Sequence, residues 1–317
     1  MSRPTTVPSS EPSFDELPQI EKLGLRHAWE VLDHDLGTLD RSSPERIVAA
    51  AGLVREGTVL PLSLSLSELD PPLFGREAAR HEIFATDRNT LDDRLDAFYP
   101  QGSSQWDGLR HVRAREFGFF GGSVEDFASG EGALGVEHFA RRGIVGRGVL
   151  IDVLAHRKRL GHSYDPLGSE AIEAQELREI LAAQRVELSR GDVICVHTGW
   201  IDAYRELDQD ARTALASDAR ASGLAGSEDM ARLLWDSGAI AVAADNPTLE
   251  VAPGDPAVGS LHRRLIPMLG FVVGELLDLG ALAALCAQDS RWDFMFVAAP
   301  LNLPGGVGSP ANAVAIR

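Results

Sequence analysis

The sequence predicts an α/β fold built as a single domain. Short apolar segments of strand length alternate along the chain with amphipathic segments of helical periodicity, a pattern typical of strands flanked by helices. Apolar residues make up 44% of the 317 residues and charged residues 24%, the composition of a folded globular protein with a sizeable core. No long linker interrupts the alternation, so one domain is expected over residues 19–317.

The first elements are predicted from capping and turn residues. Ser43 is a suitable N-cap and Pro44 suits a first helical turn, so a helix is expected from there until Gly57. The alternation of leucine and serine over 58–69 predicts a half-buried strand. The stretch "GVEHFARRGIVGRGVLIDVLAHR" then predicts a short helix, a turn and a strand at 148–154.

The remaining elements continue this alternation to the end of the chain. Amphipathic periodicity predicts helices, and apolar runs bounded by turn residues predict buried strands. We expect helices at 168–188, 227–238, 261–269 and 279–288, and strands at 191–200, 239–247, 271–275, 293–300 and 312–317.

Charge and cysteine content exclude several classes of protein. A formal net charge of −17 and a pI near 4.9 disfavour binding to nucleic acid or to an anionic membrane, because both are bound through Lys and Arg. Cys195 and Cys286 lie in apolar runs and are expected to be buried free thiols of a cytoplasmic protein. Residues 1–18 are rich in proline and serine, lack the apolar core of a signal peptide, and are expected to form a flexible tail.

One segment, "QGSSQWDGLRH" (101–111), holds many groups that bind metals or move protons. Side chains two residues apart on a strand point the same way, so Gln105 and Asp107 are expected on one face. If the chain turns helical at Asp107, His111 lies one turn above it. An amide oxygen, a carboxylate and an imidazole are all suitable ligands of a divalent metal. The spacing leaves a plainer alternative open, in which Asp107 caps a helix and His111 is a core histidine.

This segment resembles the signature His-x-Gly-Thr-His-x-Asp-x-Pro-x-His of the cyclase/kynurenine-formamidase superfamily. It is most similar to a branch of cyclases and lactone hydrolases in which the signature reads Ser/Thr-Gln-Trp-Asp-x-x-x-His. Further similar stretches, in the same order, are "GVEHFARRGIVGRGVLIDV", "GDVICVHTGW", "AADNP", "LHRRLIPMLGFVVGELLDL" and "APLNLPGGVGSPANAVAI". The resemblance implies a mixed or barrel-like β core of the swivelling β/β/α type, flanked by helices.

The resemblance also implies a metal centre. The metal-binding positions of the signature fall on Gln101, Gln105 and Asp107, and a later histidine and glutamate of the superfamily fall on His262 and Glu275. Two imidazoles of the superfamily are therefore replaced by amides in this chain. We expect one divalent ion held by Gln105, Asp107, His262 and Glu275, either manganese, which the oxygen ligands favour, or zinc.

Four further residues are expected to line the substrate pocket. Glu275 follows the apolar run "FVV" and should lie at the carboxyl end of a strand, where ligands of α/β sheets gather. His197 and Asp245 also follow buried strands and would line the same rim, with Gln101 and Trp106 beside them. A packed structural histidine and a core tryptophan are the alternatives for His197 and Trp106.

These residues predict a metal-dependent hydrolase that opens an amide, imide or lactone bond of a small molecule, with His111 as general acid and base. The alternatives are a polyketide-type cyclase using the same groups, and a metal-free small-molecule binding protein, which the two glutamines motivate. The resemblance implies a homodimer or homotetramer. The glycine-rich loop 303–310 is expected either to close over the site or to form a tight turn between the last strands.

Overall fold

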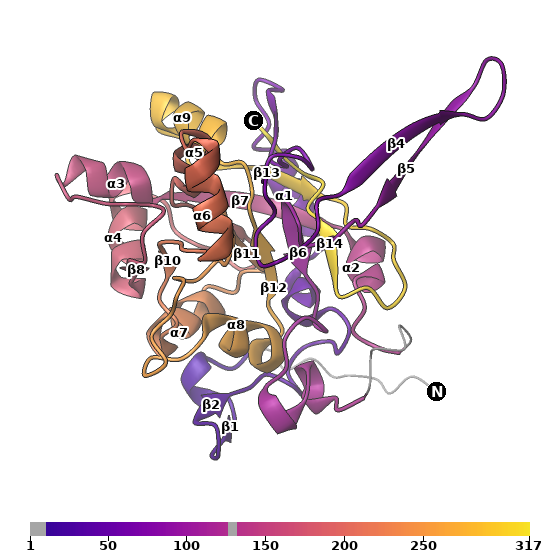
Figure 1. Ribbon diagram of the computed structural model, residues 1–317. Helices are drawn as coiled ribbons and strands as arrows, with labels where there is room; N and C mark the ends of the chain where they lie inside the picture. The colour runs from indigo at the N-terminus through magenta and orange to yellow at the C-terminus, as the bar shows by residue number, and fades with distance from the viewer. Residues whose placement is uncertain (1–10, 126–131) are drawn as a thin grey trace.

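A nine-stranded mixed sheet forms the centre of the computed structural model, which describes residues 11–125 and 132–317 (Figure 1). The strand order is β14-β6-β12-β11-β9-β7-β13-β15-β3. The four middle strands are parallel, and antiparallel pairs extend the sheet at both ends. The bounds in this order are Gly308–Pro310, Gln105–Asp107, Val272–Glu275, Ala241–Ala244, Val193–His197, Ile144–Asp152, Asp293–Ala298, Ala313–Ile316 and Val59–Pro61.

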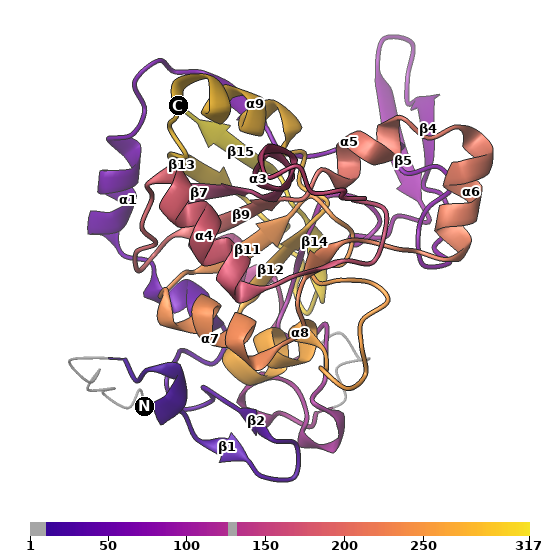
Figure 2. The ribbon, with the colours of Figure 1, turned by 90° about the vertical axis from the view of Figure 1, so that its left-hand side faces the viewer.

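Helices cover the sheet (Figure 2). The sheet separates the hydrophobic core into two layers, one on each of its faces. The helices are α1 (Pro44–Ala51), α2 (Glu137–Arg142), α3 (Val153–Arg159), α4 (Ala174–Gln184), α5 (Trp200–Arg205), α6 (Gln209–Ser217), α7 (Glu228–Asp236), α8 (Leu261–Arg263) and α9 (Gly280–Asp289). Strand residues such as Ile151 and Ile194 pack with α4 and α7 on one side, whereas Leu150 and Cys195 pack with α2 and α9 on the other. The predicted α/β class with a curled, half-barrel sheet flanked by helices is confirmed.

The central strands read as unbroken apolar runs because both faces of a parallel sheet are covered by helices. Every residue of β9, β11 and β12 is buried. This explains why the strand predictions are most accurate there. Both cysteines are buried and free, as expected.

The ends of several predicted helices and strands differ from those in the structure. The Ser43 hydroxyl caps α1 by accepting the backbone N–H of Arg46, but the helix ends at Ala51 rather than Gly57. Of the strand expected over 58–69, only β3 forms. The helix expected over 261–269 is a single turn, α8, continued by a π-helical turn, η6 (Arg264–Leu269).

The N-terminal segment differs from the expectation of a flexible tail over 1–18. Phe14 and Leu17 are buried, and a short helix, η1 (Phe14–Glu16), packs on α7. The backbone N–H of Phe14 donates to Asp236 at the end of that helix, 2.7 Å away. Residues 11–18 therefore belong to the folded body, and residues 1–10 lie outside the described part of the chain.

Three small two-stranded pairs lie outside the main sheet. They join β1 (Gln19–Ile20) to β2 (Leu25–Arg26), β8 (Ala171–Ile172) to β10 (Gly223–Leu224), and β4 (Arg80–Ala85) to β5 (Leu91–Asp96). The β4–β5 pair was not predicted, because its strands, RHEIFA and LDDRLD, are rich in charged residues and contain neither a long apolar run nor a regular alternation. Within the described residues, no helix has the length and apolar character that crossing a membrane requires.

Hydrogen bonds to α2, Arg110 and Val136 hold the glycine-rich loop before β14. The backbone N–H of Gly305 donates to Glu137 of α2 at 3.0 Å. The carbonyl of Gly305 accepts from Arg110, and that of Gly306 accepts from the backbone of Val136. Of the two readings of loop 303–310, the tight turn between the last strands describes this structure.

Candidate metal centre

Two neighbouring strands position the first group of candidate ligands. β6 pairs antiparallel with β12, with Gln105 opposite Glu275, so the two side chains share a face of the sheet. Asp107 lies two residues further along β6 and points the same way. The Gln105 amide nitrogen donates to Glu275 at 2.6 Å and lies 3.4 Å from Asp107, which confirms that Gln105 and Asp107 share a face.

His262 reaches this pair from α8. The turn begins at Ser260, whose hydroxyl accepts the backbone N–H of Arg263, and this cap fixes the direction of the histidine that follows. The His262 Nε2 atom lies 3.0 Å from Glu275 Oε1 and 3.7 Å from Asp107 Oδ2. One donor atom each from Asp107, His262 and Glu275 lie within 4.8 Å of one another. Three residues from distant parts of the chain thus converge on one point.

Glu250 was missed by the sequence analysis. Its carboxylate lies 2.7 Å from His262 Nδ1 and also accepts the backbone N–H groups of Leu261 and His262. A carboxylate on the far nitrogen of a histidine fixes its tautomer and orientation, as is usual for metal-binding histidines. Glu250 lies in the irregular stretch "NPTLEVAPG", where no periodic pattern or family motif marked it.

The electrostatics of this cluster favour a cation. Burial and the neighbouring Asp107 raise the pKa of Glu275 to about 7. Burial alone would lower the pKa of His262, but hydrogen bonds to Asp107, Glu250 and Glu275 raise it well above its usual value. His262 and Glu275 therefore tend to hold protons, which is the effect that an excess of negative charge in a buried cluster produces.

Two oxygen atoms in the cluster have no hydrogen-bond partner. Gln105 Oε1 and Asp107 Oδ2 are both buried and unpaired. Buried polar atoms normally have a partner, so these two are where a metal ion would find spare lone pairs. The donor set of two carboxylates and one oriented imidazole fits a divalent cation. The Gln105 amide presents its nitrogen to the carboxylates, so a ligand role for Gln105 requires its amide to turn over.

His111 borders the cluster from the solvent side, and the charges of two cluster carboxylates act on Arg76. The His111 Nε2 atom lies 3.8 Å from Asp107 Oδ1, and its side chain is 32% exposed. A turn follows β6 instead of the expected helix, yet it still brings His111 next to Asp107. Arg76, which precedes β4 and was not singled out, has its pKa lowered by burial, an effect that Glu275 and Asp107 partly offset. Its guanidinium is therefore within electrostatic reach of both carboxylates.

One of the residues expected in the substrate pocket, Trp106, occupies another position. Trp106 points to the opposite face of β6, where it is fully buried, packs edge-on against Phe296 and donates to the Ala311 carbonyl. It is a core residue, because neighbouring strand residues face opposite sides. Gln101 is buried beside Gly308, where any added Cβ would clash with its amide.

His197 and Asp245 form a second buried cluster instead of lining the metal centre. The His197 Nδ1 atom lies 2.9 Å from Asp152, and its Nε2 lies 3.6 Å from Asp202 and 4.0 Å from Asp245. Asp245 accepts the N–H groups that open α5. Among the described residues, no hydrogen bond or ion pair joins this cluster to Asp107, His262 or Glu275. The structural alternative for His197 is the one that the contacts support.

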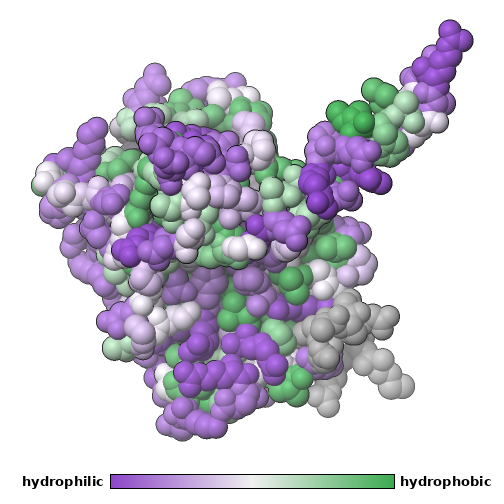
Figure 3. Space-filling view, in the orientation of Figure 1, coloured by the Kyte–Doolittle hydropathy of each residue, from purple (hydrophilic) through white to green (hydrophobic). Residues whose placement is uncertain are grey.

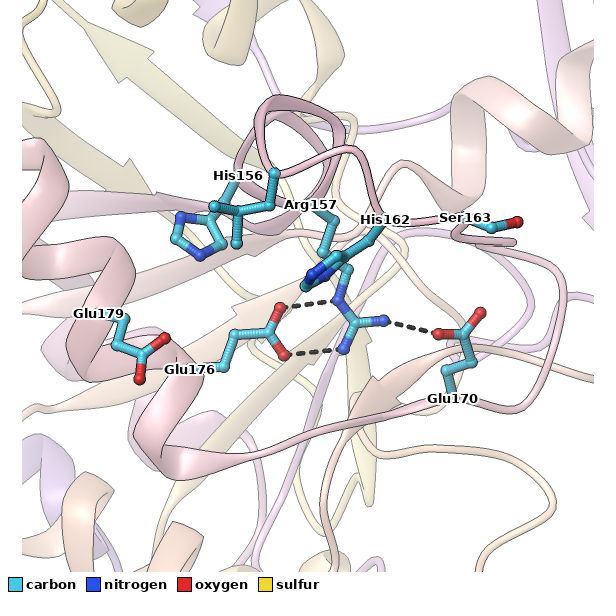
Figure 4. A pocket seen from close by; sticks show the side chains of 8 residues that line it. His156, Arg157, His162, Ser163, Glu170, Glu176 and Glu179 are labelled. Carbon is cyan, nitrogen blue, oxygen red and sulfur yellow. Dashed lines mark hydrogen bonds and ion pairs between the residues drawn. The ribbon is translucent and has the colours of Figure 1, made fainter.

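The cavities of the surface lie mostly away from the centre. A pocket of about 620 Å³ beside α3 and α4 holds His156, His162 and Arg157, but Arg157 is bound by Glu170 and Glu176, so its charges are already paired (Figure 4). Another pocket of about 630 Å³ contains Glu250 and His262 and borders the centre from the side of the positioning carboxylate.

A curled mixed sheet with carboxylates at the ends of β6 and β12, and an oriented histidine from α8 beside them, defines an α/β protein with a candidate metal centre. A family model described as "Putative cyclase" matches residues 60–251, more than half of the chain. The chain belongs to this cyclase family, which confirms the resemblance found in its sequence.

Solved structures agree with this assignment. A structure described as a novel cyclase is 29% identical, with a TM-score of 0.80 over 92% of this chain and 99% of that one. Isatin hydrolase A from Labrenzia aggregata is 16% identical, with a TM-score of 0.57 over 86% and 98% of the two chains. A protein from Bacillus stearothermophilus described as a predicted metal-dependent hydrolase is 17% identical, with a TM-score of 0.50 over 82% and 98%. The last two show the shared fold alone, and no curated protein is significantly similar to this chain.

Proposed function

We propose that this chain is a metal-dependent hydrolase that opens an amide, imide or lactone bond of a small molecule. The observation that carries the proposal is the convergence of Asp107, His262 and Glu275, with donor atoms within 4.8 Å of one another and unpaired oxygens beside them. The names of the structural neighbours, isatin hydrolase and metal-dependent hydrolase, support the same class.

The ion would be held by Asp107, His262 and Glu275, with Gln105 as a fourth ligand when its oxygen faces the cluster. A bound divalent ion supplies polarisation of a carbonyl and lowers the pKa of a water molecule. The predominance of oxygen donors favours manganese over zinc. Glu250 holds the imidazole of His262 in the tautomer that leaves Nε2 free to bind.

His111 is the proton-transfer group of this proposal. It borders the buried carboxylates and retains access to solvent, so it takes a proton from the attacking water and passes it to the leaving group. Arg76, on which the charges of Glu275 and Asp107 act, would supply a positive charge to stabilise an oxyanion that develops on the substrate.

The experiment that tests the proposal begins with metal analysis of the purified protein. We expect one equivalent of a divalent ion, removable by a chelator, and activity of the reloaded protein in a screen of lactones, formamides and cyclic imides, isatin included. A well-folded protein that binds no manganese, zinc or iron would instead support a metal-free binding protein.

The family description "cyclase" supports a second candidate, a polyketide-type cyclase that uses the same groups to enolise its substrate. Hydrolysis and cyclisation differ in whether a water molecule is consumed. Only hydrolysis introduces oxygen from water into the product, so turnover in ¹⁸O-labelled water separates them by the mass of the product.

A further inference from the structure

A cavity of about 250 Å³ lies at the lower end of the molecule, where the hairpin of β1 and β2 contacts η6 (Figure 1). Its charged lining residues are all basic: Lys22, Arg115, Arg263 and Arg264. No acidic side chain of the described residues lines it, although the chain holds 47 Asp and Glu against 30 Lys and Arg. We call this cavity the basic cleft. The space-filling view shows mostly hydrophilic residues at this end of the molecule (Figure 3).

Two guanidinium groups of the basic cleft are available to a ligand. The side chains of Arg115 and Arg263 form no hydrogen bond or ion pair with any residue that the structure describes. Glu116, which adjoins Arg115 in the chain, pairs instead with Lys22. Arg264 donates to two backbone carbonyls, which satisfy its N–H groups without neutralising its charge. Positive charges that gather in this way beside a cavity attract an anion.

The basic cleft shares part of its lining with the larger cavity that borders the metal centre. That cavity of about 630 Å³ is lined by Arg115 and Arg263 and also by Glu250 and His262. Its volume is within the range of cavities that hold small molecules, about 300–1,000 Å³. One cavity is therefore bordered both by a proposed metal ligand and by the two available arginines.

Apolar side chains also line the larger cavity. Val112, Val251, Ala252 and Pro256 contribute to it. Val112 directly follows His111, the proposed proton-transfer group, so the cavity wall continues towards the site of the reaction. A lining of this kind accepts the hydrocarbon part of a small molecule.

The two acidic residues of the larger cavity do not neutralise its arginines. Glu250 is bound to His262 at 2.7 Å. Asp255 accepts the backbone N–H of Ala257 at 2.8 Å and forms no ion pair within the described part of the chain. A guanidinium presents parallel N–H donors that match two oxygens of a carboxylate or phosphate. Two such groups that line the same cavities are suited to bind an oxyanion.

The charge and position of these arginines restrict the substrate of the proposed hydrolase, on which this inference rests. We propose that the substrate is an anion whose carboxylate or phosphate group is bound by Arg115 and Arg263. Its apolar part then lies in the larger cavity, and its amide, imide or lactone carbonyl reaches the metal centre. The acidic surface of the remaining chain repels such a molecule, so the basic cleft also directs it to the site.

Binding of simple anions tests the two arginines without any turnover. The probes are benzoate, phenyl phosphate and benzamide, which is a neutral molecule of similar shape to benzoate. We expect calorimetric titration to detect benzoate or phenyl phosphate, the tighter of the two identifying the anion, and not benzamide. This binding should persist after metal is removed with a chelator, because the arginines and not the ion hold the anion.

Matched variants identify the groups that bind the anion. Arg115→Gln and Arg263→Gln should each weaken the binding by about 10–100-fold, because each removes a charged hydrogen-bond donor. Arg113→Gln is the control, since Arg113 lies on the same segment but lines neither cavity. The proposal is overturned if neither anion binds, if binding disappears with the metal, or if Arg113→Gln causes an equal loss.

Substrates that differ only in charge separate this inference from the proposed function. Each lactone, formamide or imide of the screen that carries a carboxylate is compared with its methyl ester. We expect a higher kcat/KM for the acid, and we expect Arg115→Gln to abolish this preference by raising KM while kcat and metal content stay unchanged. Equal hydrolysis of acid and ester would refute the anionic substrate and retain the hydrolase. Anion binding through the arginines, without hydrolysis of any compound, would refute the hydrolase and retain the anion site.

Discussion

Two histidines, His262 on α8 and His197 at the end of β9, each face several carboxylates but differ in what those carboxylates bind. Around His197, both oxygens of Asp245 are occupied by the N–H groups of Thr198, Gly199 and Trp200. Around His262, the Oδ2 atom of Asp107 accepts no hydrogen bond and lies 3.7 Å from His262 Nε2. A buried histidine among carboxylates marks a metal centre only where lone pairs remain unused.

The two clusters are alike in charge. Burial would lower the pKa of His197, but hydrogen bonds to Asp152 and Asp202 and the charge of Asp245 raise it to about 10, so it is a cation that neutralises its neighbours. His262 likewise faces three carboxylates, and burial raises the pKa of one carboxylate in each cluster, Asp245 and Glu275. The clusters therefore differ in which carboxylate oxygens are left without a hydrogen bond, and not in the number of carboxylates around the histidine.

Removing each histidine gives the largest contrast. His262→Ala should abolish stoichiometric metal binding and activity, because it removes the nitrogen ligand. His197→Ala should leave metal content unchanged but lower the free energy of unfolding by about 3–5 kcal/mol, because buried aspartates lose their cation. Metal analysis of both variants gives the metal content, and denaturant unfolding gives the free energy of unfolding. Equal metal loss in the two would show that they are not separate clusters.

His111→Ala should lower turnover by about 10²–10⁴-fold while the protein keeps its metal, because the imidazole moves protons beside the ligands without binding the ion. The measurements are steady-state kinetics on the substrate found in the screen and metal content of the same preparation. His162→Ala, an exposed histidine far from β6, is the matched control and should be fully active. Full activity of His111→Ala would remove this residue from the mechanism.

Glu250→Gln should weaken metal binding by about 10–100-fold without abolishing it, because His262 loses the carboxylate that fixes its tautomer. Competition with a metal indicator measures the affinity. Asp255→Asn, on the same surface segment but without a contact to His262, is the control. An unchanged affinity in Glu250→Gln would mean that the backbone alone positions the imidazole.

The smallest effect is on the pH dependence of stability. His197 has its pKa raised from 6.5 to about 10 in the folded protein. Its ion pair with the neighbouring aspartates therefore contributes fully to the free energy of unfolding below about pH 6.5. This contribution is lost as the pH rises towards 10, because the histidine of the unfolded chain releases its proton at a lower pH. The thermal unfolding temperature of the metal-loaded wild type should decrease as the pH rises across this window. The unfolding temperature of His197→Gln should change less with pH. The same pH dependence of stability in the wild type and in His197→Gln would contradict the assignment of a raised pKa to His197.

Much of the fold and part of the site could be predicted from local pattern. The apolar runs ending in His197, Ala244 and Glu275 are buried strands, and period-two alternation correctly placed Gln105 beside Asp107. Glu250 could not be predicted, since it acts through a loop that folds back on α8. The β4–β5 pair was also missed, because its mixture of charged and apolar residues does not distinguish an exposed pair of strands from a loop.

Sequence alone indicated the central buried strands and the polar residues that follow them, because apolar runs and turn residues depend on contacts within a few residues. It could not decide which of those polar residues meet. Asp107, His262 and Glu275 come together because β6 pairs with β12 and α8 packs beside them. Asp245 lies one strand away and turns instead to α5. Tertiary packing made that choice, since only the folded chain fixes which lone pairs are taken by backbone N–H groups and which are left for an ion.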